Sequence, residues 1–238
     1  MKKLIGSLVV IGTILVLTGC GNTIQGRGAM VARDFEVSSF TGINVGGSFY
    51  VTWRQSDEFA VRIEMQENLF NYHTVDVQNN TLRVRRRNNT SLTVTNENRP
   101  RLYIYAPTIE SVNFSGSATA QNWDIVNSEN FTINISGSAV MDIALDVQSV
   151  DIVSSGSGMF TLTGTTYALD IRSSGSSRIT ANELQANTAS INISGSGRAY
   201  VNVSDELDVR VSGSGLVRYS GNPTISQHIT GSGRVEAQ

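Results

Sequence analysis

The chain has almost no cysteine, histidine or lysine, and each shortage excludes a kind of chemistry. Only Cys20 is a cysteine, so no disulfide can form within the 238 residues. Both lysines, Lys2 and Lys3, stand near the beginning, which leaves 16 arginines against 20 acidic residues and a formal charge of −4 for the rest of the chain. This acidic balance argues against nucleic acid as a general partner.

Long apolar runs are also missing, except near the beginning of the chain. Residues 4–17 are predominantly apolar, but this run is too short to span a bilayer comfortably, and no later stretch approaches twenty apolar residues. Leu17-Thr18-Gly19-Cys20 closes the run and resembles the lipobox of bacterial lipoproteins, in which the cysteine is diacylated and becomes the first residue of the mature protein. The resemblance implies a signal peptide at residues 1–19 and a durable anchor in membrane lipid, palmitate included, at Cys20.

The lipoprotein resemblance also implies a location in the cell envelope. Gly21, rather than aspartate, follows Cys20, and in Gram-negative lipoproteins this favours the outer membrane. Residues 20–33 hold three glycines and little periodicity, which predicts a flexible tether between the anchor and the domain. Residues 34–238 are sufficient for one domain.

A four-residue unit of the form Ser/Thr-Gly-Ser-Gly/Ala/Ser recurs in the second half of the chain. It begins at Ser115, Ser136, Ser155, Ser174, Ser194, Ser212 and Thr230. Successive units are 18 to 21 residues apart. A fixed period in this range, with strands on both sides of the unit, indicates a repeat architecture.

Alignment of the repeats produces columns in which apolar and polar residues alternate. One apolar column holds Val112, Ile133, Ile152, Ile171, Ile191 and Val209. The neighbouring polar column holds Ser111, Thr132, Asp151, Asp170, Ser190, Asp208 and Ser226. After each unit a further apolar column holds Ala120, Met141, Phe160, Ile179, Ala199, Val217 and Val235. This period of two predicts half-buried strands that enter and leave each turn.

These columns predict an all-β, single-domain parallel β-helix with coils of about 18–21 residues, stacked about 4.8 Å apart. The leucine-rich repeat framework is missing, and a propeller blade needs about forty residues. An ordinary β-sandwich remains the alternative. Residues 111–238 carry the regular repeats, and residues 34–110 are expected to be less regular first coils with excursions that cap the end. Within them, Gly46-Gly47-Ser48 looks like a diverged corner, and Asn79-Asn80 predicts a hairpin.

The sequence offers few residues for catalysis or metal binding. His228 falls in an outward polar column, and His73 has no cysteine or carboxylate at metal-ligand spacing. The Ser-Gly-Ser units are not phosphate loops, because no Gly-Lys-Ser follows them and no helix begins there. We therefore assign no catalytic residue, metal site or cofactor from the sequence.

Parallel β-helices do include glycosidases and polysaccharide lyases, so stacked carboxylates matter. Asp151, Asp170 and Asp208 share one outward column, and arginines stand two positions further along two of the same strands. This pattern predicts a solvated ladder of charges. A calcium-binding or glycan-binding surface is the alternative interpretation.

Arginines are concentrated in one short stretch, where Glu97 is the only acid. The candidate patch for an anionic ligand consists of Arg83, Arg85, Arg87, Arg99 and Arg101. Alternation places the first three on one face of a strand. Arginine binds phosphate and carboxylate groups with two hydrogen bonds, so anionic glycans or lipid headgroups are candidate ligands. A charged edge that only blocks aggregation is the alternative.

Two segments connect the chain with a known family. Phe40-Thr41-Gly42-Ile43-Asn44-Val45 and Val61-Arg62-Ile63-Glu64, together with the Ser-Gly-Ser repeats, resemble the head GIN domain family, whose members are called "putative auto-transporter adhesins". The resemblance covers nearly all of residues 34–238. It implies a lipid-anchored cell-envelope module for binding or adhesion, without enzymatic activity, whose partners are envelope or host glycans or surface proteins. The alternatives are a structural spacer and a carbohydrate-active enzyme on the same fold.

The last coil differs from the others. Gln227 replaces the isoleucine or valine of its inward column, and the neighbouring residues are polar. An open coil presents unpaired strand backbone, which polar residues can protect from pairing. The pattern therefore predicts an exposed C-terminal coil and slightly favours a monomer over an end-to-end dimer.

Overall fold

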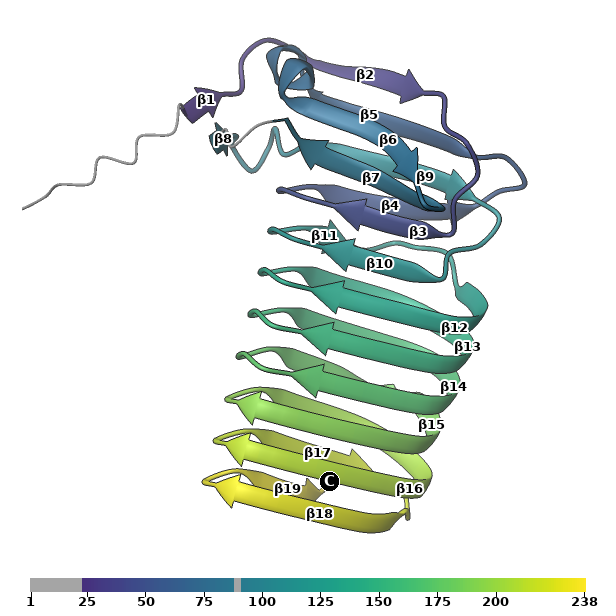
Figure 1. The fold of residues 1–238 in the computed structure, drawn as a ribbon, viewed down its shortest axis with the longest axis vertical. Helices are drawn as coiled ribbons and strands as arrows, with labels where there is room; N and C mark the ends of the chain where they lie inside the picture. The colour runs from purple at the N-terminus through teal and green to yellow at the C-terminus, as the bar shows by residue number, and fades with distance from the viewer. Residues whose placement is uncertain (1–22, 88–90) are drawn as a thin grey trace, which may run out of the picture.

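The computed structural model describes residues 23–87 and 91–238, so the predicted signal peptide and Cys20 lie outside the described residues. The chain forms a flattened β-solenoid of about seven turns with coils of about 19 residues (Figure 1). The coil strands are β3 (Gly42–Val45), β4 (Tyr50–Gln55), β7 (Thr81–Arg86), β9 (Arg101–Ala106), β10 (Ser111–Phe114), β11 (Thr119–Ala120), β12 (Val126–Ile135), β13 (Val140–Ser154), β14 (Met159–Ser173), β15 (Arg178–Gly195), β16 (Arg198–Gly213), β17 (Leu216–Ser220), β18 (Thr224–Gly231) and β19 (Arg234–Ala237). Neighbouring coils pair in parallel, which rules out the sandwich.

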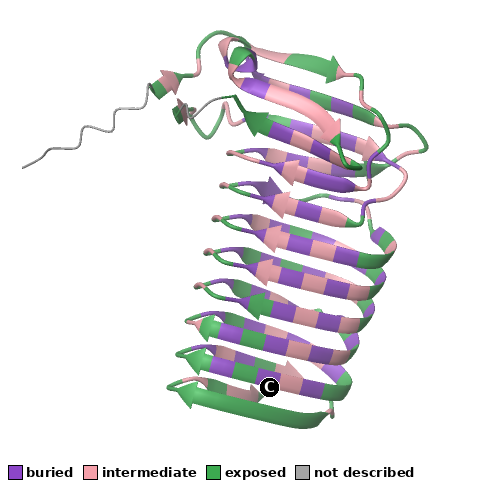
Figure 2. Ribbon diagram, in the orientation of Figure 1, coloured by how far each residue is buried: buried purple, intermediate pink, exposed green. Residues whose placement is uncertain are grey.

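The predicted columns are confirmed as pairs of residues in register. Ile152, Ile171 and Ile191 lie opposite one another on β13, β14 and β15, and each is at most 1% exposed. The column of Met141, Phe160 and Ile179 pairs in the same way and is also buried. Buried and accessible residues consequently alternate along the strands of the regular coils, such as β13, β14 and β15, whereas β18 of the last coil is exposed along its length (Figure 2). The apolar columns form one continuous core between the two flat sheets of the solenoid.

The Ser-Gly-Ser corners lie at one edge of the solenoid, where successive coils approach closely. Ser157 N donates to Gly137 O at 3.0 Å, so the carbonyl of one corner points into the next. A Cβ atom at Gly156 would stand 2.0 Å from that same Gly137 oxygen, which no side chain tolerates. In the later coils the glycine has a positive φ as well, as at Gly213 with 116°. Close approach therefore explains the glycine in the earlier coils, and positive φ adds to it in the later ones.

The first coils are out of chain order. The coil of β3 and β4 pairs on one side with β10 and β11, and on its other side with β7 and β9. Gly46 and Gly47 form its corner, next to Ser115 and Gly116, as the diverged copy predicted. After its first two strands, the chain thus forms the second coil with β3 and β4, then the terminal coil with β7 and β9, and then returns to continue the stack at β10.

Antiparallel strands form a cap beyond the terminal coil. The cap elements are β1 (Thr23–Gln25), β2 (Met30–Phe35), β5 (Ala60–Gln66), the 3₁₀ helix η1 (Glu67–Tyr72), β6 (His73–Gln78) and β8 (Ser91–Thr93). β6 pairs with β7 through the predicted hairpin, in which Asn79 and Asn80 have φ of 51° and 58°. β5 pairs with β9 and β2. The cap therefore covers both sheet edges at this end of the solenoid.

The prediction of a flexible tether at residues 20–33 is wrong for residues 23–33, the part of it that the structure describes. β1 pairs with β8, and β2 pairs with β5 from Met30 onward. Between the two strands, Arg27 N donates to Asn68 Oδ1 at 2.8 Å. Gly26, counted as a sign of flexibility, is instead a packing position, because a Cβ atom there would lie 2.0 Å from Gln66 Oε1. Glycine content alone does not distinguish glycines that are needed for close packing from glycines in a flexible segment.

Candidate functional site

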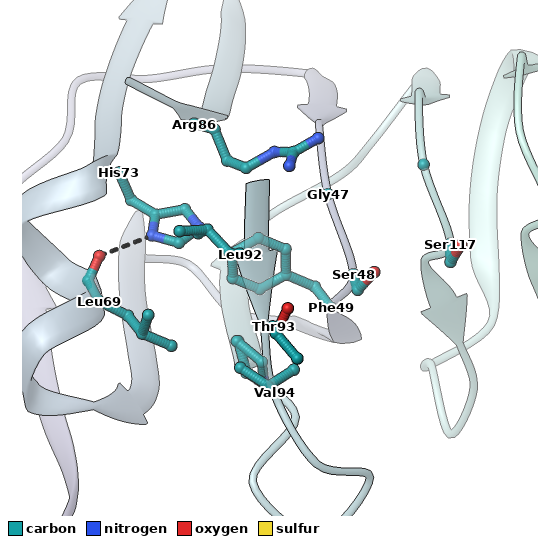
Figure 3. Close-up of a pocket in the computed structure, with 12 residues that line it drawn as sticks. Gly47, Ser48, Phe49, Leu69, His73, Arg86, Leu92, Thr93, Val94 and Ser117 are labelled. Carbon is teal, nitrogen blue, oxygen red and sulfur yellow. Dashed lines mark hydrogen bonds between the residues drawn. The ribbon is translucent and has the colours of Figure 1, made fainter. Parts of the chain in front are cut away.

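A cavity of about 350 Å³ lies between the cap and the Ser-Gly-Ser corners of the first coils (Figure 3). We call it the cap pocket. Its lining comprises Gly47, Ser48, Phe49, Leu69, His73, Arg86, Leu92, Thr93, Val94, Pro100, Gly116 and Ser117. These residues come from the corners, η1, the ends of β6 and β7, and the segment around β8. The pocket therefore depends on pairings between distant parts of the chain.

The lining of the cap pocket combines apolar and polar residues. Phe49 and Leu69 are fully buried, and Leu92 and Val94 pack against the same core. Arg86 and Thr93 bring a cation and a hydroxyl group to the lining (Figure 3). Such a combination suits a ligand with an apolar part and an anionic or polar end.

His73 is the titratable group at the wall of the cap pocket and is only 8% exposed. Its Nδ1 lies 2.9 Å from the Leu69 carbonyl oxygen, so in the neutral ring Nδ1–H donates and Nε2 is left as an acceptor. The ring packs edge-on against Phe49, with 5.4 Å between the ring centroids. Burial lowers the pKa of His73, the hydrogen bond to Leu69 partly opposes this, and the charge of Arg86 lowers the pKa further. The lowered pKa favours the neutral form of the ring.

Hydrogen bonds bring together only two of the five arginines predicted as a ligand patch. Arg83 and Arg85 both contact Asp76 on β6, at 2.6 and 3.1 Å. Burial raises the pKa of Asp76, but the hydrogen bonds and charges of the two arginines outweigh it, and the net pKa is lowered. The alternation that places Arg83 and Arg85 on one face of the strand is thus correct. Their positive charges are compensated by Asp76, which lies outside the arginine-rich stretch.

The remaining arginines of that set have separate surroundings. Arg101 lies on β9, in the opposite sheet, 3.5 Å from Glu64. Arg99 stacks over the Tyr50 ring at 4.4 Å and donates to the carbonyl groups of Phe49 and Ser117, so it joins two corners. Arg87 is exposed beyond the end of β7. The five residues do not form one ligand site, because strand pairing distributes them over both sheets.

The outward aspartates form the ladder expected from the sequence. Arg172 contacts Asp151 at 3.0 Å and Asp170 at 3.1 Å, and Arg210 contacts Asp208 at 2.8 Å. Burial raises the pKa of Asp170, Arg172 lowers it, and Asp151 raises it. Over the part of the chain that the structure covers, no group of three or more histidine, cysteine, aspartate or glutamate residues could hold a metal ion. The geometry accordingly favours the ladder of compensated charges.

Comparison with known proteins identifies the class. The family model described as "Putative auto-transporter adhesin, head GIN domain" matches residues 39–223, and the chain belongs to this family. A "putative adhesin" of Bacteroides fragilis has a similar structure, with a TM-score of 0.84 and 26% identity over 90% of this chain and 100% of its own. A "putative lipid binding protein" of Parabacteroides distasonis has a TM-score of 0.71 and 25% identity over 91% and 100%. No curated protein matches the chain.

Proposed function

We propose that the protein is a lipid-anchored binding module of the cell envelope, of the adhesion type and without enzymatic activity. Membership of a family of adhesins supports an adhesion-type role at the cell surface or envelope. The described residues include no helix that is long and apolar enough to cross a membrane. Acylation of Cys20, with export to the outer membrane, is the anchor that we propose.

One observation carries the proposal: strand β1 begins only three residues after Cys20. Strand β1 starts at Thr23 and is held by β8. Three residues of extended chain span at most about 11 Å. An acylated Cys20 would therefore hold β1 and the cap close to the lipid surface, and the coils of the solenoid extend away from the cap (Figure 1). This arrangement presents the two flat faces and the far end to other molecules, as a surface-bound adhesin requires.

The cap pocket supports a second candidate function, the binding of an amphiphile from the membrane. Phe49, Leu69 and Arg86 line it, and β8, which contributes to the lining, pairs with β1, the strand nearest the proposed anchor. The relative from Parabacteroides distasonis, which is called a "putative lipid binding protein", has the same fold at 25% identity. Both observations support lipid binding close to the lipid surface.

Metabolic labelling with a radioactive or clickable fatty acid tests the anchor. We expect the wild-type chain to carry the label and to fractionate with the membrane, and Cys20→Ala to remain an unlabelled, unprocessed precursor. Cells that express the wild-type chain should also adhere to immobilised envelope or host-surface material better than cells that lack it. Absence of label from the wild type would refute the anchor, and equal adhesion of both cell types would refute the adhesion role.

A further inference from the structure

The edge of the solenoid opposite the Ser-Gly-Ser corners carries a groove of about 540 Å³. It runs across the bends of β13, β14, β15 and β16, which lie on the right in Figure 1. Two parallel rows of side chains flank it, and we call it the polar trough. The first row holds Asp146, Thr165, Gln185 and Asn202, which the strand pairing places side by side. The second row, two residues further along each coil, holds Gln148, Tyr167, Asn187 and Ser204.

The floor of the polar trough is closed and narrow. Val147, Thr166 and Ala186 lie between the two rows and are at most 5% exposed. The Thr166 hydroxyl group donates to backbone oxygens at the same bend. The trough therefore offers no apolar pocket for a side chain of a protein partner. A ligand of the trough must therefore be recognised by the side chains of the two rows.

The rows carry groups that both donate and accept hydrogen bonds. Within the described residues, the side-chain amides of Gln148 and Gln185 and the hydroxyl group of Tyr167 make no hydrogen bond to another residue. Neighbouring groups are oriented by contacts within the rows, such as Thr165 Oγ1, which donates to Asp146 Oδ1 at 2.9 Å. Amides and hydroxyl groups match the hydroxyl groups of a sugar, which also donate and accept.

Tyr167 adds an exposed aromatic surface. Its side chain is 58% exposed, although it stands among polar residues on a rigid bend. An aromatic ring in such a place can pack against the C–H face of a sugar ring while its hydroxyl group stays hydrated. Asp146 lines the trough, and Asp205 accepts a hydrogen bond from the lining residue Asn187 at 3.1 Å. These two acids disfavour a polyanion.

We propose that the polar trough binds a neutral linear polysaccharide along the axis of the solenoid. Four coils spaced about 4.8 Å apart give a track of about 14 Å, which suits a polymer rather than a single sugar. The inference rests on the proposed adhesion function and gives it a site and a class of ligand. In the orientation that the anchor imposes, the trough lies on the coils beyond the cap and is open to polymers outside the membrane.

Binding of the full-length acylated protein, in detergent, to immobilised polysaccharides tests the proposal. Mannan and xylan serve as neutral probes, and polygalacturonate as the acidic probe. We expect the wild type to bind a neutral probe, and Tyr167→Ala and Gln185→Ala to weaken this binding about tenfold and about threefold. Tyr105→Ala, a matched tyrosine on β9 near the cap, should leave binding unchanged. Asp146→Asn should raise binding to polygalacturonate, because it removes a negative charge from the first row of the trough.

The same variants separate this inference from the proposed function. Unaltered thermal unfolding of each variant shows that its fold is retained. If the wild type binds neither neutral probe, or if Tyr167→Ala and Gln185→Ala bind as well as the wild type, the polysaccharide site is refuted. If cells that express either variant adhere as well as cells that express the wild type, the trough is refuted as the adhesion site, and the adhesion role of the protein is retained. If cells that express the wild type adhere no better than cells that lack the protein, the adhesion role is refuted instead.

Discussion

The stacked isoleucine column makes a sharp prediction about Ile171. The residue is fully buried between Ile152 and Ile191, which lie opposite it on the two neighbouring coils. Ile171→Asp removes an apolar side chain, at a cost of about 2–3 kcal/mol, and buries a carboxyl group without a partner, at a further cost of about 2 kcal/mol. We therefore expect a loss of about 4–5 kcal/mol in the free energy of unfolding, more than most single substitutions cause.

The neighbouring residue supplies a control on the same strand. Asp170 points outward, and its ion pair with Arg172 lies at the surface, where such pairs contribute about 0–1 kcal/mol. Burial raises the pKa of Asp170, so its ionised form is less favourable than that of a fully solvated aspartate. Asp170→Ala should therefore change the free energy of unfolding by less than about 0.5 kcal/mol. Ile171→Val, which removes one methyl group, should cost about 1 kcal/mol.

Thermal unfolding followed by circular dichroism measures the three variants. For a domain of this size about 1 kcal/mol corresponds to about 2–4 °C in Tm, so Ile171→Asp should lower Tm by about 10 °C or more. Asp170→Ala should stay within about 2 °C of the wild type. Similar losses of Tm in Ile171→Asp and Asp170→Ala would mean that the two residues do not face opposite sides, and would refute the register of the solenoid.

Three further predictions concern the corner, the cap and the last coil. Gly156→Ala should lower Tm by about 5 °C or more, because its Cβ would lie 2.0 Å from Gly137 O, whereas Ser157→Ala in the same corner should change Tm little. Burial lowers the pKa of His73, so its contribution to stability is present above about pH 6.5, the unfolded value, and is lost as pH falls through the folded value. His73→Gln should abolish this acid-induced loss of Tm, and persistence of the loss would contradict the assignment. Backbone amides of β18, which is exposed along its length, should exchange hydrogen faster than those around Ile171, and equal protection would show that another chain covers it.

The regular coils could be predicted from the sequence because their information is local and repeated. The apolar columns, the diverged corner at Gly46 and the hairpin at Asn79-Asn80 each depend on a few adjacent residues, and the structure confirms them. The order of the first coils and the antiparallel cap depend on which distant strands pair, and no local pattern encodes this. The same limit explains Arg101, which Glu64 of the distant strand β5 compensates. Asp76, in contrast, faces Arg83 across the predicted hairpin, so the sequence did contain this pairing.

The two candidate sites escaped prediction for related reasons. The cap pocket joins residues as distant as Gly47 and Ser117. The first row of the polar trough lies 10, 10, 11 and 8 residues after the start of the preceding Ser-Gly-Ser unit, so it does not form a column when the repeats are aligned on that unit. β-bulges cause the change, since the pairing of β15 with β16 shifts register between Ala181 and Gln185. Alternation of polar residues at each bend was the one signal in the sequence that could have indicated the trough.

The sheet edges are covered by cap strands at one end of the solenoid and are exposed at the other end. This difference agrees with the proposed orientation. At the end that our proposal places next to the lipid surface, β6, β5 and β2 cover both sheet edges, so the core of the first coils is closed there. At the other end, β18 is exposed along its length and Gln227 takes the place opposite Val209 where the other coils have aliphatic residues. Exposed strand backbone invites pairing with other chains, and a polar residue at this position opposes it. The end that lies farthest from the membrane in our proposal is thus protected by polarity, which leaves the faces and edges of the solenoid as the surfaces for recognition.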